Sequence, residues 1–175
     1  PIREALLKLE QEGFVSRLPR GGFITSRFTQ KDIDQIFDIR SLLESYAVGL
    51  AIQHIKKEDI LWLERNIKES EQYIQRKEWN RVSKLNTEFH DYLNGLSKNE
   101  RLLSVINGLR DQIFQFRSAI LRVPAKAKIS IDHHKKMIDA IKKREVTLLK
   151  RLAQEHIQVG KEVILAEINK GSIKL

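Results

Sequence analysis

The sequence predicts a mainly α-helical protein in which one helix and a two-stranded hairpin precede an antiparallel bundle of six helices. Apolar residues recur at intervals of three and four along most of the chain, which is the period of a helix with one buried face. The links between these helical segments are short, and a strand pattern occurs only near residues 14–25. Together these observations favour a helical bundle over a sheet-based fold.

Composition limits the classes of function. Of the 175 residues, 41% are hydrophobic and 31% are charged, which is typical of a globular, helix-rich protein. The net charge of +9 and the pI near 9.8 suit an anionic partner such as nucleic acid. The absence of cysteine excludes disulfides and thiolate metal sites. No apolar run approaches the roughly 20 residues of a membrane span, so we expect a cytoplasmic protein without a membrane partner.

The first 27 residues predict a helix followed by a hairpin. Apolar residues at positions 2, 5, 6 and 9 form one face of a helix over 1–12, and Gly13 ends it. The segment 16–25 has a proline and two glycines at its centre, which is typical of a hairpin with a tight tip. This order is that of the second half of a winged helix-turn-helix, whose DNA-facing charges would be Arg3, Arg17 and Arg20. The alternative is an ordinary helix and hairpin with solvated arginines.

An all-helical region begins near residue 28, so the chain divides into domains 1–27 and 28–175. Thr29 and Asp32 have the spacing of a capping box at the start of a helix that runs to about residue 55. Further helices are expected at 57–77, 79–96, 99–122, 130–142 and 145–169.

Histidines in the last two of these helices predict a shared site. The helices meet near Arg144, with His134 ten residues before it and His156 twelve residues after it. On antiparallel helices both imidazoles would lie about 15 to 18 Å from the turn, level with each other. Upstream, Asn86 and His90 are four residues apart and share one helix face. These four side chains form a hypothetical metal site, and the alternative is a set of packed core histidines.

Two arginines could anchor an anionic ligand beside this site. Arg40 and Arg117 lie on helices that would line the same cavity, and a guanidinium fork fits a carboxylate. The alternative is ion pairing of these arginines with Glu44 or Asp111 inside the bundle.

Two sets of motifs resemble a known family. The segments 1–6 (PIREAL), 12–13 (EG) and 19–22 (PRGG) resemble the recognition helix and wing of GntR-family transcription regulators. The later motifs resemble the FCD effector domain of the FadR-like subfamily, and they are 32–33 (DI), Arg40, 43–44 (LE), 50–51 (LA), 89–90 (FH), 97–99 (SKN), His134, 140–141 (AI) and His156. The resemblance implies an FCD-type helical bundle after a partial winged helix-turn-helix.

The resemblance also implies a metal site. His90, His134 and His156 match the three histidines with which many FCD domains hold a divalent metal, and an organic acid completes the shell. The family's aspartate is replaced here by Asn86, which is neutral, so a bound ion would keep more of its charge. Zinc, nickel and manganese all suit imidazole ligands.

The resemblance implies a ligand-responsive bacterial transcription regulator, a repressor that binds operator DNA as a homodimer. Arg3, Arg20 and Gly21 match DNA-contacting positions of relatives. Because the chain begins with Pro1 and not with methionine, we expect a fragment or processed product that lacks the first helices of the winged helix. The alternatives are a metal-dependent enzyme with a three-histidine centre and a metal-free sensor of a larger apolar ligand.

Overall fold

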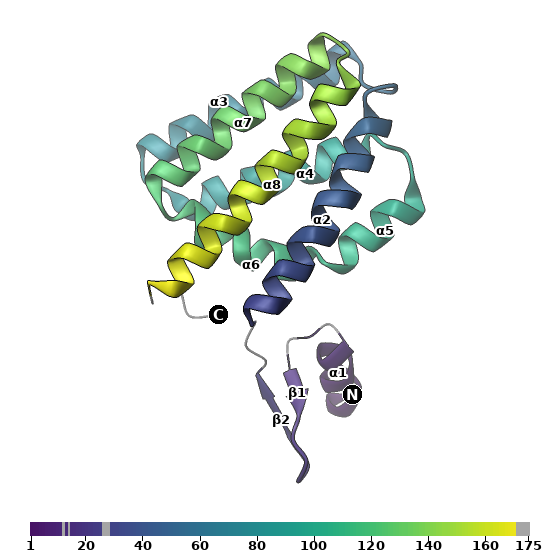
Figure 1. The fold of residues 1–175 in the computed structure, drawn as a ribbon, viewed down its shortest axis with the longest axis vertical. Helices are drawn as coiled ribbons and strands as arrows, with labels where there is room; N and C mark the ends of the chain where they lie inside the picture. Colours follow the sequence, from purple (N-terminus) through teal and green to yellow (C-terminus); the bar gives the residue numbers. More distant parts are fainter. Residues whose placement is uncertain (12, 14, 26–28, 171–175) are drawn as a thin grey trace.

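The computed structural model describes residues 1–11, 13, 15–25 and 29–170, and within these ranges it leaves out the side chains of residues 25, 110, 111, 113, 115, 117 and 119. The molecule has a small helix-and-hairpin unit followed by a larger group of helices (Figure 1). Within the described part of the chain, no helix combines the length and the apolar character needed to cross a membrane.

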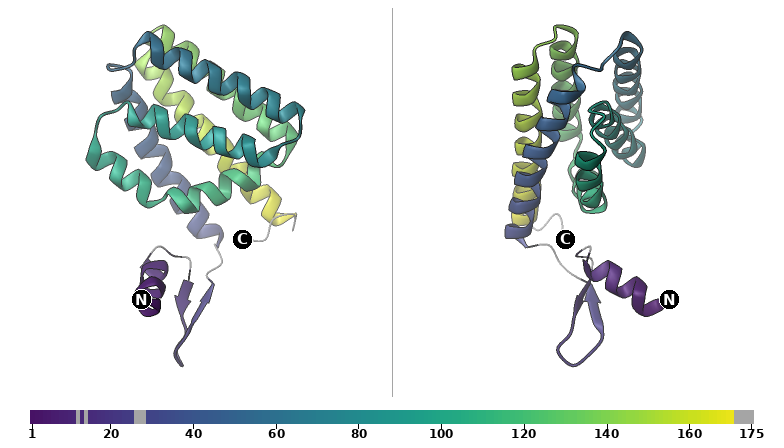
Figure 2. Two further views of the ribbon diagram at one scale, coloured as in Figure 1. Left: turned by 180° about the vertical axis from the view of Figure 1, so that it is seen from behind. Right: turned by 90° about the vertical axis from the view of Figure 1, so that its right-hand side faces the viewer.

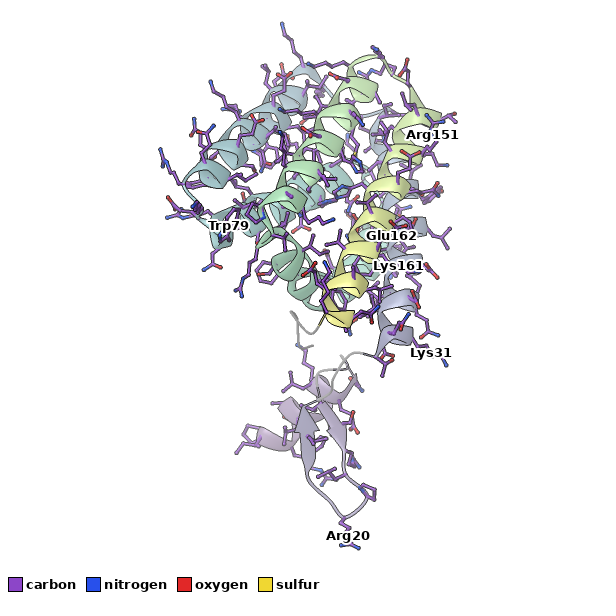
Figure 3. The ribbon with its side chains drawn as sticks, turned by 60° about the vertical axis from the view of Figure 1, so that its left-hand side comes forward. Arg20, Lys31, Trp79, Arg151, Lys161 and Glu162 are labelled. Atoms are coloured by element: carbon purple, nitrogen blue, oxygen red, sulfur yellow. The ribbon has the colours of Figure 1, made fainter. Side chains whose placement is uncertain are left out.

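The predicted N-terminal helix and hairpin are confirmed. They are α1 (Ile2–Gln11), β1 (Val15–Arg17) and β2 (Phe23–Thr25). The strands are antiparallel, with Ser16 opposite Ile24. Gly21 and Gly22 turn the chain at the tip with φ angles of 88° and 90°, a region that favours glycine. Arg20 projects from this tip (Figure 3).

The remaining helices pack in an antiparallel bundle. In chain order they are α2 (Gln30–Ala51), α3 (Lys57–Gln75), α4 (Trp79–Gly95), α5 (Glu100–Gly108), α6 (Arg110–Leu121), α7 (Pro124–Lys142) and α8 (Val146–Asn169). α8 lies beside α2 and α7, whereas α3 packs against α4 and α7 (Figure 2). α4 also packs against α2 and α6, so it faces the interior between α2, α7 and α8.

The start of α2 has the predicted capping box. The Thr29 hydroxyl accepts a hydrogen bond from the backbone N–H of Asp32, and Asp32 Oδ2 accepts one from the Thr29 N–H at 2.8 Å. The Thr29 hydroxyl also donates a hydrogen bond of 2.6 Å to Asp32 Oδ2. This bond, and then the one from the Thr29 N–H, lower the pKa of Asp32, which keeps the carboxylate charged at the positive end of the helix dipole. The beginning of α2 is therefore fixed by its own sequence.

Three predicted helix boundaries were wrong. The single helix expected over 99–122 is divided into α5 and α6, because Gly108 ends the first and Leu109 leaves the helical conformation. α7 begins at Pro124 rather than residue 130. Proline is favoured at the first position of a helix, because the N–H that it lacks would have no hydrogen-bond partner within the helix there. α2 ends at Ala51 rather than near residue 55. Within the described residues the bundle thus has seven helices and not six, and the predicted fold class is confirmed.

Arg144 holds the turn between α7 and α8 against the end of α2. Its guanidinium donates to the backbone carbonyls of Ile52 and Ile55, at 2.8 Å in the second case. The contact anchors the α7–α8 hairpin over the largest apolar cluster of the core, which includes Ala51, Leu63, Phe89, Met137, Ile141 and Leu149.

Candidate metal and ligand site

Three histidines from three helices meet in the interior of the bundle, as the sequence predicted. His90 comes from α4, His134 from α7 and His156 from α8. The ring centroids of His134 and His156 lie 4.7 Å apart, and those of His90 and His134 lie 5.0 Å apart. His90 and His134 are buried, and His156 is half-buried. The antiparallel α7–α8 hairpin therefore places His134 and His156 at the same height along the two helices.

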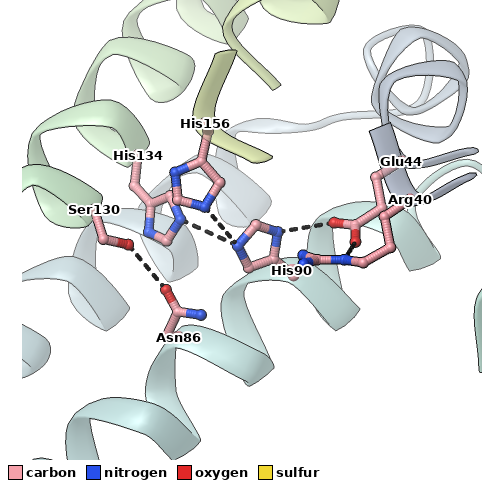
Figure 4. A network of polar contacts seen from close by, with 7 residues as sticks. All are labelled: Arg40, Glu44, Asn86, His90, Ser130, His134 and His156. Atoms are coloured by element: carbon pink, nitrogen blue, oxygen red, sulfur yellow. Dashed lines mark hydrogen bonds and ion pairs between the residues drawn. The ribbon is translucent and has the colours of Figure 1, made fainter. Parts of the chain in front are cut away.

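Each of the three rings directs its Nε2 atom toward the same point (Figure 4). His90 Nε2 lies 3.3 Å from His134 Nε2 and 3.2 Å from His156 Nε2. Two nitrogens that bind one zinc ion at about 2.0 to 2.1 Å with a tetrahedral angle are about 3.4 Å apart. The ligand atoms of all three residues lie within 4.8 Å of one another, so this group could hold a metal ion.

A buried ion pair orients His90. Glu44 Oε2 lies 3.1 Å from His90 Nδ1, and Glu44 Oε1 accepts a hydrogen bond of 2.9 Å from Arg40 Nε. Arg40 and Glu44 are only 4% and 2% exposed, so little water screens the pair. Because His90 Nδ1 donates to the carboxylate, its Nε2 carries the lone pair that faces the other two histidines. A metal ligand needs this tautomer.

The sequence alone indicated Glu44 only as a possible ion-pair partner of Arg40. The structure contains this ion pair. The contact with His90 could not be predicted, because it joins α2 to α4 across 46 positions of the chain. Arg40 retains a second role, since it also lines a pocket beside the histidines. The backbone of Arg117 lies in α6, but its side chain is outside the described residues, as is that of Asp111.

Asn86 lies near the histidines but has another partner. Its Oδ1 accepts a hydrogen bond of 3.1 Å from the hydroxyl of Ser130, toward which it points in Figure 4. Ser130 lies on α7 and was not among the predicted site residues. One lone pair of the Asn86 carbonyl is thus occupied, and the second remains able to accept or to coordinate.

A pocket opens beside the three histidines. It encloses about 50 Å³, within a hollow of about 500 Å³ that includes its open mouth. Among the residues whose side chains the structure describes, its polar lining residues are Arg40, Asn86, Lys126, Ser130, His133 and His156, and its other lining residues are apolar. A lining that offers cations and hydrogen-bond donors is suited to an anion.

His133 contributes to this pocket although it does not join the histidine group. Its Nδ1 is buried and has no hydrogen-bond partner among the described residues. Its ring lies edge-on to that of His156, with centroids 5.8 Å apart. Helical spacing alone could not show that this ring borders a pocket.

Burial at this centre predicts a dependence of stability on pH. Desolvation, then the neighbouring His90 and His133, lower the pKa of His156 well below its usual range. An unfolded imidazole takes up a proton near about pH 6.5, so below this pH the unfolded state binds more protons than the folded state. For metal-free protein we expect stability to be retained above about pH 7 and to fall by up to about 1.4 kcal/mol per pH unit as the pH drops below about 6.

Urea titrations at several pH values measure this effect. A His156→Gln variant should have a flatter profile, whereas His54→Gln, at an exposed position after α2, should keep the parental one. An unchanged pH profile in His156→Gln would count against a neutral buried ring.

The architecture defines the class of protein: part of a winged helix followed by a helical bundle of the FCD type. The FCD domain family matches residues 35–159, a range that includes all three histidines. The chain belongs to the FCD-domain branch of the GntR family of transcription regulators.

Individual relatives agree with this assignment. The chain is 31% identical over 158 residues to the HTH-type transcriptional regulator YdhC of Bacillus subtilis, covering 90% of this chain and 69% of that protein. It is 27% identical over 169 residues to the gluconate operon transcriptional repressor of Bacillus licheniformis, covering 93% and 69%. The structure of E. coli McbR/YncC has a TM-score of 0.83 at 21% identity and covers 94% of this chain and 83% of its own, which shows the shared fold.

Proposed function

We propose that the protein is a ligand-responsive repressor in which a small carboxylate, bound with a divalent metal at His90, His134 and His156, controls binding to operator DNA. The observation that carries this proposal is that the Nε2 atoms of His134 and His156 lie 3.3 and 3.2 Å from Nε2 of His90. The chemistry of this all-imidazole donor set suits zinc, nickel or manganese. A bound ion would supply a positive centre for a carboxylate.

The protein's own residues would position the ion and the acid. Glu44 holds His90 in the tautomer that coordinates a metal. The Asn86 carbonyl is available as a fourth ligand, although it already accepts from Ser130. Arg40 borders the pocket and is a candidate anchor for the carboxylate, together with Arg117.

The N-terminal part would provide the DNA contacts. Residues 1–27 would form the end of a winged-helix domain, and 28–175 the effector domain. Arg3, Arg20 and Gly21 are exposed on α1 and at the hairpin tip, which supports the proposal that they contact DNA as parts of a recognition helix and a wing. Two half-sites require two winged helices, so the acting species in the bacterial cytoplasm would be a homodimer.

The enzyme alternative has less support. Catalysis at the histidines would need a general base, and Glu44, the acid that contacts His90, is held by Arg40. Glu88 is two residues from Asn86 on α4 and pairs with Lys84 at the surface, at 3.8 Å. A metal-free sensor of a larger ligand is less consistent with three facing imidazole nitrogens.

Operator binding by the full-length protein tests the DNA contact. We expect Arg20→Ala to weaken binding at every salt concentration and to reduce the slope of log K against log salt by about one for each wing, because each lost phosphate contact releases about one counterion fewer. Fluorescence anisotropy with labelled operator measures both quantities. Arg101→Ala removes an equally exposed arginine from α5 and should leave the slope unchanged. A parental slope in Arg20→Ala would count against the wing contact.

A further inference from the structure

The outer face of α2 has an exposed apolar stripe. Ile39, Leu42 and Tyr46 are 46%, 67% and 52% exposed, and Leu42 is the most exposed large apolar side chain among the described residues of the bundle. The other residues from Ile39 to Ala51 are buried or half-buried. Beside α2 lies α5, whose Val105 is 55% exposed (Figure 1). The solvent-facing side of a helix is normally polar, so this stripe indicates a contact surface.

The stripe has the spacing of a coiled-coil seam. Its members are Gln35, Ile39, Leu42 and Tyr46, and they are separated by four, three and four residues. This spacing keeps them on the face that one helix presents to a second helix beside it. Gly49 is the next position in the pattern, but a Cβ atom there would lie 2.9 Å from Cδ of Lys150 on α8. The lysine therefore ends the α2 stripe, which spans residues 35–46, or about 16 Å.

The charges around the α2 stripe suit a second copy of this chain. In a symmetric contact, a residue near the twofold axis meets its own copy, so a charge there would repel itself. None of the four stripe residues is charged, although 31% of the chain is. Between them, Arg40 and Glu44 point into the bundle and pair with each other. At the border, Asp38 pairs with Lys161 of α8 at 2.9 Å, which offsets its charge.

The direction of pairing follows from the place where the hairpin joins the bundle. The hairpin precedes the start of α2 and extends beyond that end of the helix (Figure 1). Two α2 helices that pair in parallel would place both hairpins at the same end, where one DNA duplex can meet both. Antiparallel pairing would place the hairpins at opposite ends of a helix about 33 Å long, pointing away from each other. Two half-sites on one duplex therefore favour the parallel arrangement.

We propose that the α2 stripe is the interface at which two copies of this chain pair, with their α2 helices parallel and Leu42 packed against Leu42 of the second copy. Val105 of α5 borders this contact and extends its apolar area. This inference rests on the proposed function, and it adds the surface and the direction through which the homodimer forms.

Sedimentation equilibrium of the 175-residue chain and of its Leu42→Glu variant tests the interface. We expect a dimer for the parent and a dissociation constant at least about 100-fold higher for the variant, because symmetry removes two apolar anchors and places two carboxylates against each other. Leu42 is largely exposed within one copy, so the helical content and the metal content should stay parental. Leu61→Glu is the matched control, since that leucine is 48% exposed on α3, and it should dimerise like the parent.

Three results would overturn the proposed interface. They are a Leu42→Glu variant that dimerises like the parent, an equal loss in both variants, and a parent that stays monomeric at every concentration. The last result would leave the stripe to a partner of another sequence. Each is distinguishable from a failure of the proposed function, because metal content and operator binding by the full-length protein are measured separately.

Disulfide cross-linking tests the direction of pairing, since the chain contains no cysteine of its own. On parallel helices each residue faces its own copy, so Ile39→Cys alone and Tyr46→Cys alone should each give a covalent dimer on mild oxidation. In an antiparallel pair centred near Leu42, Ile39 would face Tyr46, and each would lie about 10 Å along the helix from its own copy. Covalent dimers only in a mixture of the two variants would overturn the parallel arrangement. Leu61→Cys is the control and should remain monomeric on a non-reducing gel.

Discussion

Protein purified without chelators is expected to contain about one divalent metal ion per chain, and its His134→Ala variant almost none. His134 is 1% exposed and its Nε2 lies 3.3 Å from that of His90, so the variant removes one of three donors from a buried centre. Two neutral imidazoles hold a divalent ion far more weakly than three, because each lost bond leaves the ion poorly coordinated in a largely apolar interior. Elemental analysis of both proteins measures the ion directly and identifies it.

His133→Ala is the matched control for this experiment. It removes the adjacent imidazole from the same helix, and that ring does not belong to the group of three ligand atoms. Its metal content should therefore equal that of the parent. An equal loss in both variants, or a parent that stays empty after incubation with zinc, nickel and manganese, would rule out the three-histidine centre.

Replacement of Glu44 by glutamine is expected to destabilise the metal-free protein by about 3 to 5 kcal/mol. The substitution keeps the shape of the side chain but leaves the charge of Arg40 uncompensated in an interior where it is 4% exposed. It also removes the carboxylate that accepts a hydrogen bond from His90 Nδ1 and so keeps Nε2 available to a metal. Metal affinity should therefore fall about 10- to 100-fold. Urea unfolding without metal and a competition titration with metal separate the two effects.

The double variant Arg40→Met with Glu44→Leu is the control for the loss of charge balance. Both charges are removed and replaced by apolar side chains, so the free energy of unfolding should return close to the parental value. Metal affinity should remain low in this variant, because His90 still lacks its carboxylate. If Glu44→Gln unfolds at the parental urea concentration, the ion pair does not contribute as argued.

Local patterns in the sequence were sufficient to predict most of the fold. The capping box at Thr29 acts over three residues, and the level positions of His134 and His156 follow from the constant rise of two antiparallel helices. The division between α5 and α6 was missed because one glycine within an apolar pattern is tolerated in many helices.

The unpredicted parts of the site are contacts between distant segments. Ser130 meets Asn86 across 44 positions of the chain, and Glu44 meets His90 across 46. Such pairs depend on how three helices rotate about their axes when they pack, which the spacing within one helix does not fix. The same limit applies to His133, whose position beside the pocket depends on the packing of α7 against α8.

The helix that begins at the Thr29 capping box is also the helix that carries Arg40 and Glu44. Fifteen residue steps separate Thr29 from Glu44, so this part of α2 acts as a stiff rod about 22 Å long. A tilt of about five degrees at the histidine end displaces the far end by about 2 Å, which is comparable with the helix shifts seen in allosteric proteins. Under the proposed function, a ligand that binds Arg40 would therefore move the end of α2 that follows the hairpin in the chain. In that proposal, the rigidity of α2 is the property that would transmit the signal.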